Sequence, residues 1–225
     1  MSLATQERRS LLELLARSTD NSAFYAALTG ADGVREINEV AGLRADPRYR
    51  LVRVDHRLGK ANSNKFEVAL LDDIELSVAY YNKVTLVRAP GVSSRQLAHN
   101  IVWRSASNRH SLALHDISQK VLFNYIVQNY DIFLAADLMT DGGNFHWHRQ
   151  VSRAIENGLH VYVYNPATQA LEPAATQYAL NDIKDQTWSG TNQEAMKAII
   201  SAAPLELCHI ICDARAISIF NYLLQ

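Results

Sequence analysis

The sequence predicts a domain of the α/β (α+β) class, in which a mixed, mostly antiparallel sheet carries flanking helices. Two observations support this class. Residues 46–104 contain runs that alternate apolar and polar positions, which is typical of half-buried strands, and residues 105–225 alternate between helical and strand-like segments. Residues 1–45 add helices at the N-terminus. No repeat or linker divides the 225 residues, so we expect a single domain.

Composition narrows the range of functions. The chain has 22 Lys and Arg against 23 Asp and Glu, a formal net charge of -1, which gives no strong signal for a general nucleic-acid binder. Two cysteines cannot build a disulfide framework, which favours a reducing compartment. Glu13 and Arg17 interrupt the first apolar run, so we expect no signal peptide there, and no stretch reaches the ~18 apolar residues that span a bilayer. We expect a cytoplasmic protein without a membrane partner.

The N-terminal part is predicted to be helical. Leucines and aromatic residues between Thr5 and Leu28 recur at helical spacing with charges between them. Asp20–Ser22 are expected to cap a second short helix that starts near Ala23, and Val34–Leu43 are expected to form another.

An antiparallel meander is predicted next. Tyr49–Leu58 alternates apolar and polar residues, and the three runs that follow are rich in Val, Ile, Tyr and Thr. These runs are 65–73, 74–89 and 97–104. Asp72 and Asp73 end the first of these runs, and we interpret this pair as a solvated turn between two strands.

The second half predicts a helix over 117–130, a buried strand over 131–137 and a helix that ends at Gly158. Strands are predicted over 159–165 and 170–174, and a further helix within 188–204. Two apolar runs close the chain, and each reads as either strand or helix.

The turn after the buried strand is the most distinctive segment. Asp137 ends the strand, and Gly142 and Gly143 permit positive φ and a close approach of the backbone. The N–H groups of the helix that follows are expected to suit an anion. The alternative is a plain strand-to-helix turn with Thr140 or Asp141 as the N-cap.

Four motifs carry a resemblance to a known family. They are NIVWR, VQNYDIFLAAD, TDGGNFHWHRQVSRAIENGLHVYVYN and TWSG, within Asn100–Gly190. This order of a Trp-Arg pair, a buried strand ending in Asp, a glycine turn, a helix with Trp and a Val-Tyr strand resembles uncharacterised phage and mobile-element proteins with the GNAT-like N-acyltransferase fold.

The resemblance implies acyl transfer from acetyl-CoA or another acyl-CoA to an unknown amine. The thioester would bind near a splayed strand, and a base would take the proton of the attacking amine. The implied candidates for the catalytic base are Asp137, His146 and His148. The implied cofactor-binding residues are Arg104, Ser105, Asn108 and Arg109. The implied substrate-binding residues are Trp103, Thr140, Gly142, Gly143 and Trp147. Both Trp side chains are expected near Asp137.

One feature departs from that family. Its glycine-rich pyrophosphate turn is replaced here by Trp103–Lys120, a segment without glycine. The departure favours either an unusual acyl donor or a fold relative that binds a host protein or nucleic acid without catalysis.

A second resemblance competes with the first. Gln150, Ala154, Gly158 and Val161 repeat the spacing E-x-x-x-A-x-x-x-G-x-x-V of a helix in nucleoside deoxyribosyltransferases. That family places a Glu nucleophile where this chain has Gln150.

Other chemistry finds little support in the sequence. His146 and His148 would point about 200° apart on a helix, so we expect no shared metal ion. His110 and His115 are interpreted as isolated histidines, and Cys208 and Cys212 as core thiols beside His209. No G-x-S-x-G elbow, P-loop or G-x-G-x-x-G motif occurs.

Overall fold

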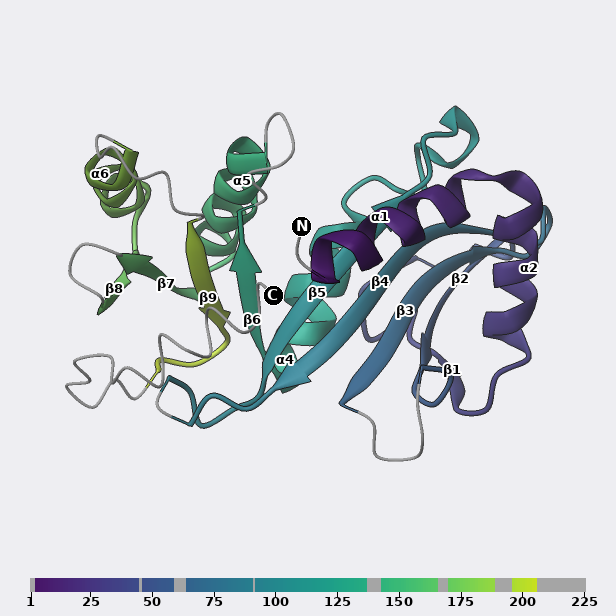
Figure 1. Cartoon of the computed structure of the whole chain (residues 1–225), viewed down its shortest axis with the longest axis horizontal. Helices are drawn as coiled ribbons and strands as arrows, with labels where there is room; N and C mark the ends of the chain where they lie inside the picture. Colours follow the sequence, from purple (N-terminus) through teal and green to yellow (C-terminus); the bar gives the residue numbers. More distant parts are fainter. Residues whose placement is uncertain are drawn as a thin grey trace. The chain divides into compact units, whose positions relative to one another are not determined.

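The computed structural model describes residues 3–44, 46–58, 64–90, 92–136, 143–165, 170–188 and 196–205. Contacts group the chain into two compact units. The first contains residues up to Leu86, Asn100–Tyr125 and the last two residues, and the second contains Val87–His99 and Ile126–Leu223. Figure 1 labels the elements of both.

The predicted α+β class with a mixed sheet is confirmed. Nine strands are found among the described residues, and their pairings are mostly antiparallel. The division of the chain at residues 45 and 104 stays a prediction.

The first unit contains two helices and a run of strands. The helices are α1 (Leu3–Ala16) and α2 (Ser18–Thr29). The strands, in both chain order and sheet order, are β1 (Val34–Glu36), β2 (Tyr49–Val54), β3 (Lys65–Asp72), β4 (Ser77–Val87) and β5 (Leu97–Arg104). The first three residues of β5 and the last residue of β4 belong to the second unit. Strands β2 to β4 pair antiparallel, as the predicted meander requires, and β1 adds an antiparallel edge strand that was not predicted.

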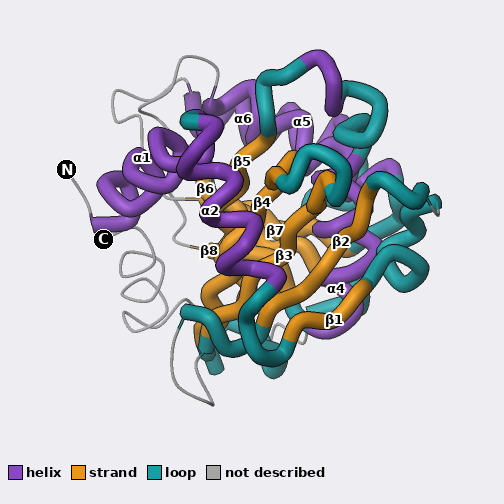
Figure 2. Tube along the Cα trace, turned by 90° about the vertical axis from the view of Figure 1, so that its right-hand side faces the viewer, coloured by secondary structure: helices purple, strands orange, loops and turns teal. Residues whose placement is uncertain are grey.

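Helices α1 and α2 cover one face of these strands (Figure 2). Leu15 and Leu28 are buried against Val52, Ala69 and Tyr81 of the sheet. Buried residues of the apolar stripe predicted from the sequence therefore pack against this face of the sheet and shield it from solvent.

Two expectations for the N-terminal part are wrong. The second helix begins at Ser18 rather than near Ala23. The segment Val34–Leu43 is not a helix, because β1 pairs Val34 with Val54, and the N–H of Ile37 donates to the carbonyl of Leu51 at 2.8 Å. An edge strand satisfies these backbone groups against β2, which outweighs a weak helical pattern.

A helical stretch follows β5. It begins with the 3-10 turn η1 (Asn108–His110) and continues through α3 (Ile117–Gln119), the π-helix η2 (Lys120–Ile126) and α4 (Val127–Asn129). The helix predicted over 117–130 is confirmed, although its middle is π-helical. Such a stretch is rare.

The described residues of the second unit contain four strands and two helices that follow α4 in the chain. Its elements are β6 (Asp131–Ala135), α5 (Gly143–Glu156), β7 (His160–Asn165), β8 (Ala170–Pro173), α6 (Gln177–Trp188) and β9 (Lys197–Ser201). The strand order is β5-β6-β9-β7-β8, with β5 parallel to β6 and the other pairs antiparallel. Leu97, Phe133, Tyr164 and Ile199 pack together on one face.

The helix predicted within 188–204 is wrong. Lys197–Ser201 form β9, which lies between β6 and β7 with all five residues buried. A central strand that is covered on both faces shows a continuous apolar run instead of alternation, and periodicity cannot distinguish it from a short helix. The helix of this region is α6, which the sequence pattern did not lead us to expect. The two closing apolar runs lie outside the described residues, apart from Leu205.

None of the described helices combines the length and the apolar character needed to cross a membrane.

The buried Asn21 gives a test of how the helices attach to the sheet. Its amide nitrogen donates to the carbonyls of Leu15 and Val78 at 3.0 and 3.1 Å, and its amide oxygen accepts from the N–H of Val78 at 2.7 Å. Asn21→Ala leaves three buried backbone groups without these bonds, and we expect a loss of about 2–4 kcal/mol in the free energy of unfolding. Urea denaturation measures this loss.

Glu13→Ala, which removes an exposed ion pair with Arg9, is the control and is expected to cost less than about 0.5 kcal/mol. Equal effects of the two variants would contradict the anchoring role.

Candidate functional site

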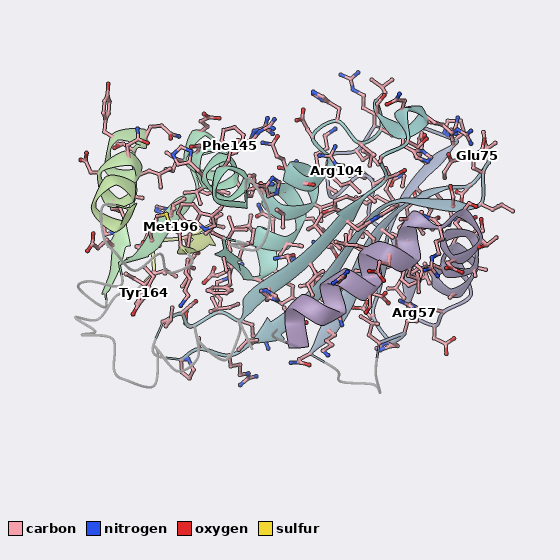
Figure 3. All side chains as sticks on the ribbon, turned by 45° about the horizontal axis from the view of Figure 1, so that its top comes forward. Arg57, Glu75, Arg104, Phe145, Tyr164 and Met196 are labelled. Atoms are coloured by element: carbon pink, nitrogen blue, oxygen red, sulfur yellow. The ribbon has the colours of Figure 1, made fainter. Side chains whose placement is uncertain are left out.

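The predicted cofactor residues lie at and after the end of β5, in the first unit (Figure 3). Arg104 donates from Nη2 to the carbonyl of Leu114 at 2.7 Å, and Arg109 forms an ion pair with Glu75 at 2.7 Å. The N–H of Ser105 donates to the carbonyl of Ala79 at 2.9 Å. Asn108 is exposed at the start of η1. The structure therefore fixes this segment through side-chain and backbone bonds.

Trp103 belongs to the core of the first unit. Its side chain is buried and packs in the cluster that contains Leu15, Leu28 and Tyr81. Trp147 belongs to the second unit, and Asp137 lies outside the described residues. The proximity of the two Trp side chains to Asp137 stays a prediction.

A group of charged and polar side chains surrounds Asp72, where β3 ends. We call Arg48, Tyr49, Asp72, Glu75, Arg109 and His110 the Asp72 cluster. The carboxylate of Asp72 is 0% exposed. Its Oδ2 accepts from Nε and Nη2 of Arg48 at 3.0 and 2.7 Å, and its Oδ1 accepts from two backbone N–H groups of the turn. The expectation of a solvated turn is wrong for Asp72, because this residue is the last of β3 and η1 lies against it through His110.

The interpretation of His110 as an isolated histidine is also wrong. Its ring is buried, with Nδ1 at 3.1 Å from the Tyr49 hydroxyl and 3.5 Å from Oδ2 of Asp72. The rings of Tyr49 and His110 meet edge to face at 6.1 Å. Tyr49 is 61 residues away in the sequence, so no local spacing indicated this contact.

The protonation states of the cluster follow from burial and charge. Burial lowers the pKa of His110, and Arg48 and Arg109 lower it further, against the opposing effect of Asp72. Burial alone would raise the pKa of Asp72, but hydrogen bonds from Arg48 and from the N–H groups of Glu75 and Ile74 bring it below the ordinary value of 3.8. Burial also raises the pKa of Tyr49. At neutral pH the cluster therefore holds an ionised carboxylate, a neutral phenol and a neutral imidazole.

In the second unit the predicted site surrounds the start of α5. A helix follows the turn, as predicted, but it begins already at Gly143, which was expected to belong to the turn. Asp137, Thr140 and Gly142 lie outside the described residues. Trp147 is 2% exposed, and its Nε1 donates to the carbonyl of Leu134 at 3.2 Å. This bond ties the first turns of α5 to the end of β6.

The two histidines of α5 differ in surroundings. His146 is exposed, whereas Nε2 of His148 lies 3.3 Å from Oδ1 of Asn181 in α6. Ser152 and Gln177 add a second link between the same helices, at 2.9 Å. His148 therefore takes part in packing α5 against α6, in addition to being a candidate base.

Lys197 is a buried cation that none of the sequence motifs singled out. It is 5% exposed and opens β9, opposite Ala135 of β6 and Tyr164 of β7 (Figure 3 labels Tyr164). Its Nζ lies 5.5 Å from the centre of the Tyr164 ring. Lysine is rarely buried, so a lysine within an apolar strand is uncommon. Its place in the apolar run of β9 is the feature by which the sequence could have indicated Lys197 as a candidate functional residue.

The spacing that resembles deoxyribosyltransferases has an explanation in the fold. Ala154 and Val161 are buried, and Gly158 has φ of 72°, the left-handed conformation that ends a helix. These positions follow from packing and from the turn between α5 and β7, and they carry no argument for that activity.

Comparison with known proteins found no matching family model, no matching curated protein and no matching solved structure.

The Asp72–Arg48 pair gives a test of the cluster's energetics. Asp72→Asn removes the buried negative charge that Arg48 needs, and we expect it to lower the free energy of unfolding at pH 7 by about 2–4 kcal/mol. Because the pKa of Asp72 is lowered on folding, its contribution is present above the unfolded value and is lost as pH falls below 3.8 through the folded value. The difference from wild type should therefore shrink in acid.

Denaturation between pH 7 and pH 2 measures this difference. Asp20→Asn is the control, because Asp20 is 42% exposed and its ion pair with Arg17 is a surface pair, so only a small difference from wild type is expected. A constant difference across this pH range would contradict the assignment of Asp72 as the ionised partner.

Proposed function

We propose that the chain is a GNAT-like acyl-transfer protein that moves an acyl group from an acyl-CoA to an amine. The observation that carries this proposal is the parallel strand pair β5 and β6, which lies beside the antiparallel pairs of β6, β9, β7 and β8. A helical stretch joins the two strands, and α5 and β7 follow. This is the order of strand, helix, strand, helix, strand that the resemblance implies.

The register of the parallel pair supports a location for the thioester. Leu97, Ala98 and His99 pair with Asp131, Ile132 and Phe133, and the registered pairing ends there. Strand β6 continues through Leu134 and Ala135. In the proposed reaction the thioester binds against the backbone of β6 beyond Phe133, near the carboxyl end, where open sheets bind ligands.

The chemistry is a direct displacement. The amine nitrogen attacks the thioester carbonyl, the carbon–sulfur bond breaks, and coenzyme A leaves with the sulfur while a base accepts the proton of the amine. Asp137, His146 and His148 remain the proposed bases. His148 has an additional partner in Asn181, and His146 is on the exposed side of α5.

Arg104 and Arg109 are the proposed contacts to the pyrophosphate. Each guanidinium has five N–H donors, so the bonds to Leu114 and Glu75 leave donors for phosphate oxygens. The arginine side chains would then supply the hydrogen-bond donors to the pyrophosphate that a glycine-rich turn supplies through its backbone N–H groups.

Calorimetry with acetyl-CoA tests the proposal. We expect binding by the wild type, and a loss of at least tenfold in affinity, about 1.4 kcal/mol, in the double variant Arg104→Ala and Arg109→Ala. Arg35→Ala is the matched control, because Arg35 is also an exposed arginine of the first unit that pairs with a carboxylate, Asp55. Circular dichroism checks that the variants fold.

The alternatives give different results. No heat with millimolar acetyl-CoA would sink the acyl-transfer proposal and leave a host-protein or nucleic-acid binding module ahead. Binding of acetyl-CoA without thiol release in the presence of a panel of primary amines would indicate the fold without catalysis.

A further inference from the structure

We propose that His110 is a positioning residue for the segment Arg104–Arg109, and that it makes the affinity for the acyl donor fall as pH falls. This inference rests on the proposed function, since that segment is the proposed pyrophosphate contact. It goes further because it assigns a regulatory property to a residue that touches neither cofactor nor substrate.

The first step is the anchor. The His110 ring is 6% exposed and faces two strands, with Tyr49 at the start of β2 and Asp72 at the end of β3. With Nδ1 unprotonated, the hydroxyl of Tyr49 donates to it at 3.1 Å. The backbone that carries His110 is thereby held against the sheet of the first unit.

The second step links this anchor to the arginines. The N–H of Leu114 donates to the carbonyl of His110 at 2.8 Å, and the carbonyl of Leu114 accepts from Arg104 at 2.7 Å. Leu114 is itself buried. Arg109 precedes His110 and pairs with Glu75. A displacement of His110 would therefore change the position of both guanidinium groups.

Two turns that adjoin the His110 contacts contain a residue with a strained backbone, which indicates that contacts hold this region in place. Among the residues that the structure describes, Leu76 and Asp116 are the non-glycine residues with positive φ, at 48° and 57°. Leu76 follows Glu75, and Asp116 ends the turn that starts after η1. Such conformations cost about 1–3 kcal/mol each and persist when surrounding contacts hold them.

The third step is the effect of a proton. Protonation turns Nδ1 from an acceptor into a donor, so the Tyr49 hydroxyl can no longer donate to it and must turn its hydrogen toward another acceptor. The new cation faces the carboxylates of Asp72 and Glu75, but Asp72 is already bound by Arg48, and Arg48 and Arg109 repel the charge. Burial adds to the cost and lowers the pKa of His110. We therefore expect protonation to release the segment.

A measurement on the protein without ligand tests the anchor. Nitrogen-15 NMR of the histidine rings should show Nδ1 of His110 unprotonated at pH 7.5, with a midpoint below the ordinary value of 6.5. The amide signals of residues 105–114 should shift with that same midpoint. A midpoint at or above 6.5, or amide signals that do not follow it, would overturn the proposal.

A binding measurement tests the consequence. We expect the Kd for acetyl-CoA to rise at least fivefold more between pH 7.5 and pH 5.5 in the wild type than in His110→Gln. The phosphate of coenzyme A has a pKa of about 6 and titrates equally in every experiment, so its effect on Kd cancels when the variants are compared. His115→Gln is the control and should keep the wild-type ratio, because His115 is only five residues after His110 but its side chain is 78% exposed.

The two proposals fail in different ways. No binding of acetyl-CoA at either pH removes the proposed function, and the NMR titration still decides whether His110 anchors the segment. Binding with equal pH dependence in the wild type and in His110→Gln keeps the proposed function and removes the role of His110.

Discussion

Buried carboxylates on β3 set the constraint on which the first unit depends. Asp72 ends this strand and Glu67 lies near its start, and both side chains are 0% exposed. A buried charge is costly unless it is paired and hydrogen-bonded. Arg48 before β2 and Arg57 after β2 supply the two partners, and the Tyr81 hydroxyl adds a bond to Glu67 at 2.5 Å. Slippage of β2 against β3 would separate both pairs at once, so the charges fix the register as well as the apolar faces do.

A similar dependence on charged side chains extends to the segment after β5. A glycine-rich turn binds anions with its own N–H groups, and it needs little support from neighbouring side chains. The segment of this chain contains no glycine and is held by Arg104, Arg109 and His110 instead. Its shape therefore depends on ionisable groups, which links the proposed cofactor contact to the charge state of the sheet beside it.

Much of the strand pattern was predictable, and the reasons are local. β5 has the predicted bounds Leu97–Arg104, and β2 and β3 begin at the first residues of the predicted runs. Alternation indicated β2, whereas β3 is buried along almost its whole length and was indicated by its strand-forming residues. β9 was missed because a strand buried on both faces has no alternation. Asp72 and His110 were missed for another reason. Their partners are distant in sequence, and only the folded sheet brings them together.

The π-helix η2 has a consequence for how this chain tolerates changes in length. A π-helical stretch is an α-helix that has accepted extra residues, and each residue in an α-helix advances the side chains by about 100°. Within η2, Asn124 donates to the carbonyl of Ala41 at 3.2 Å, and Tyr125 accepts from Arg53 at 3.3 Å. A sequence one residue shorter before Asn124 would present a different face to these partners. Variants of this protein across lineages should therefore differ in length within loops, while the spacing from Lys120 to Ile126 is retained.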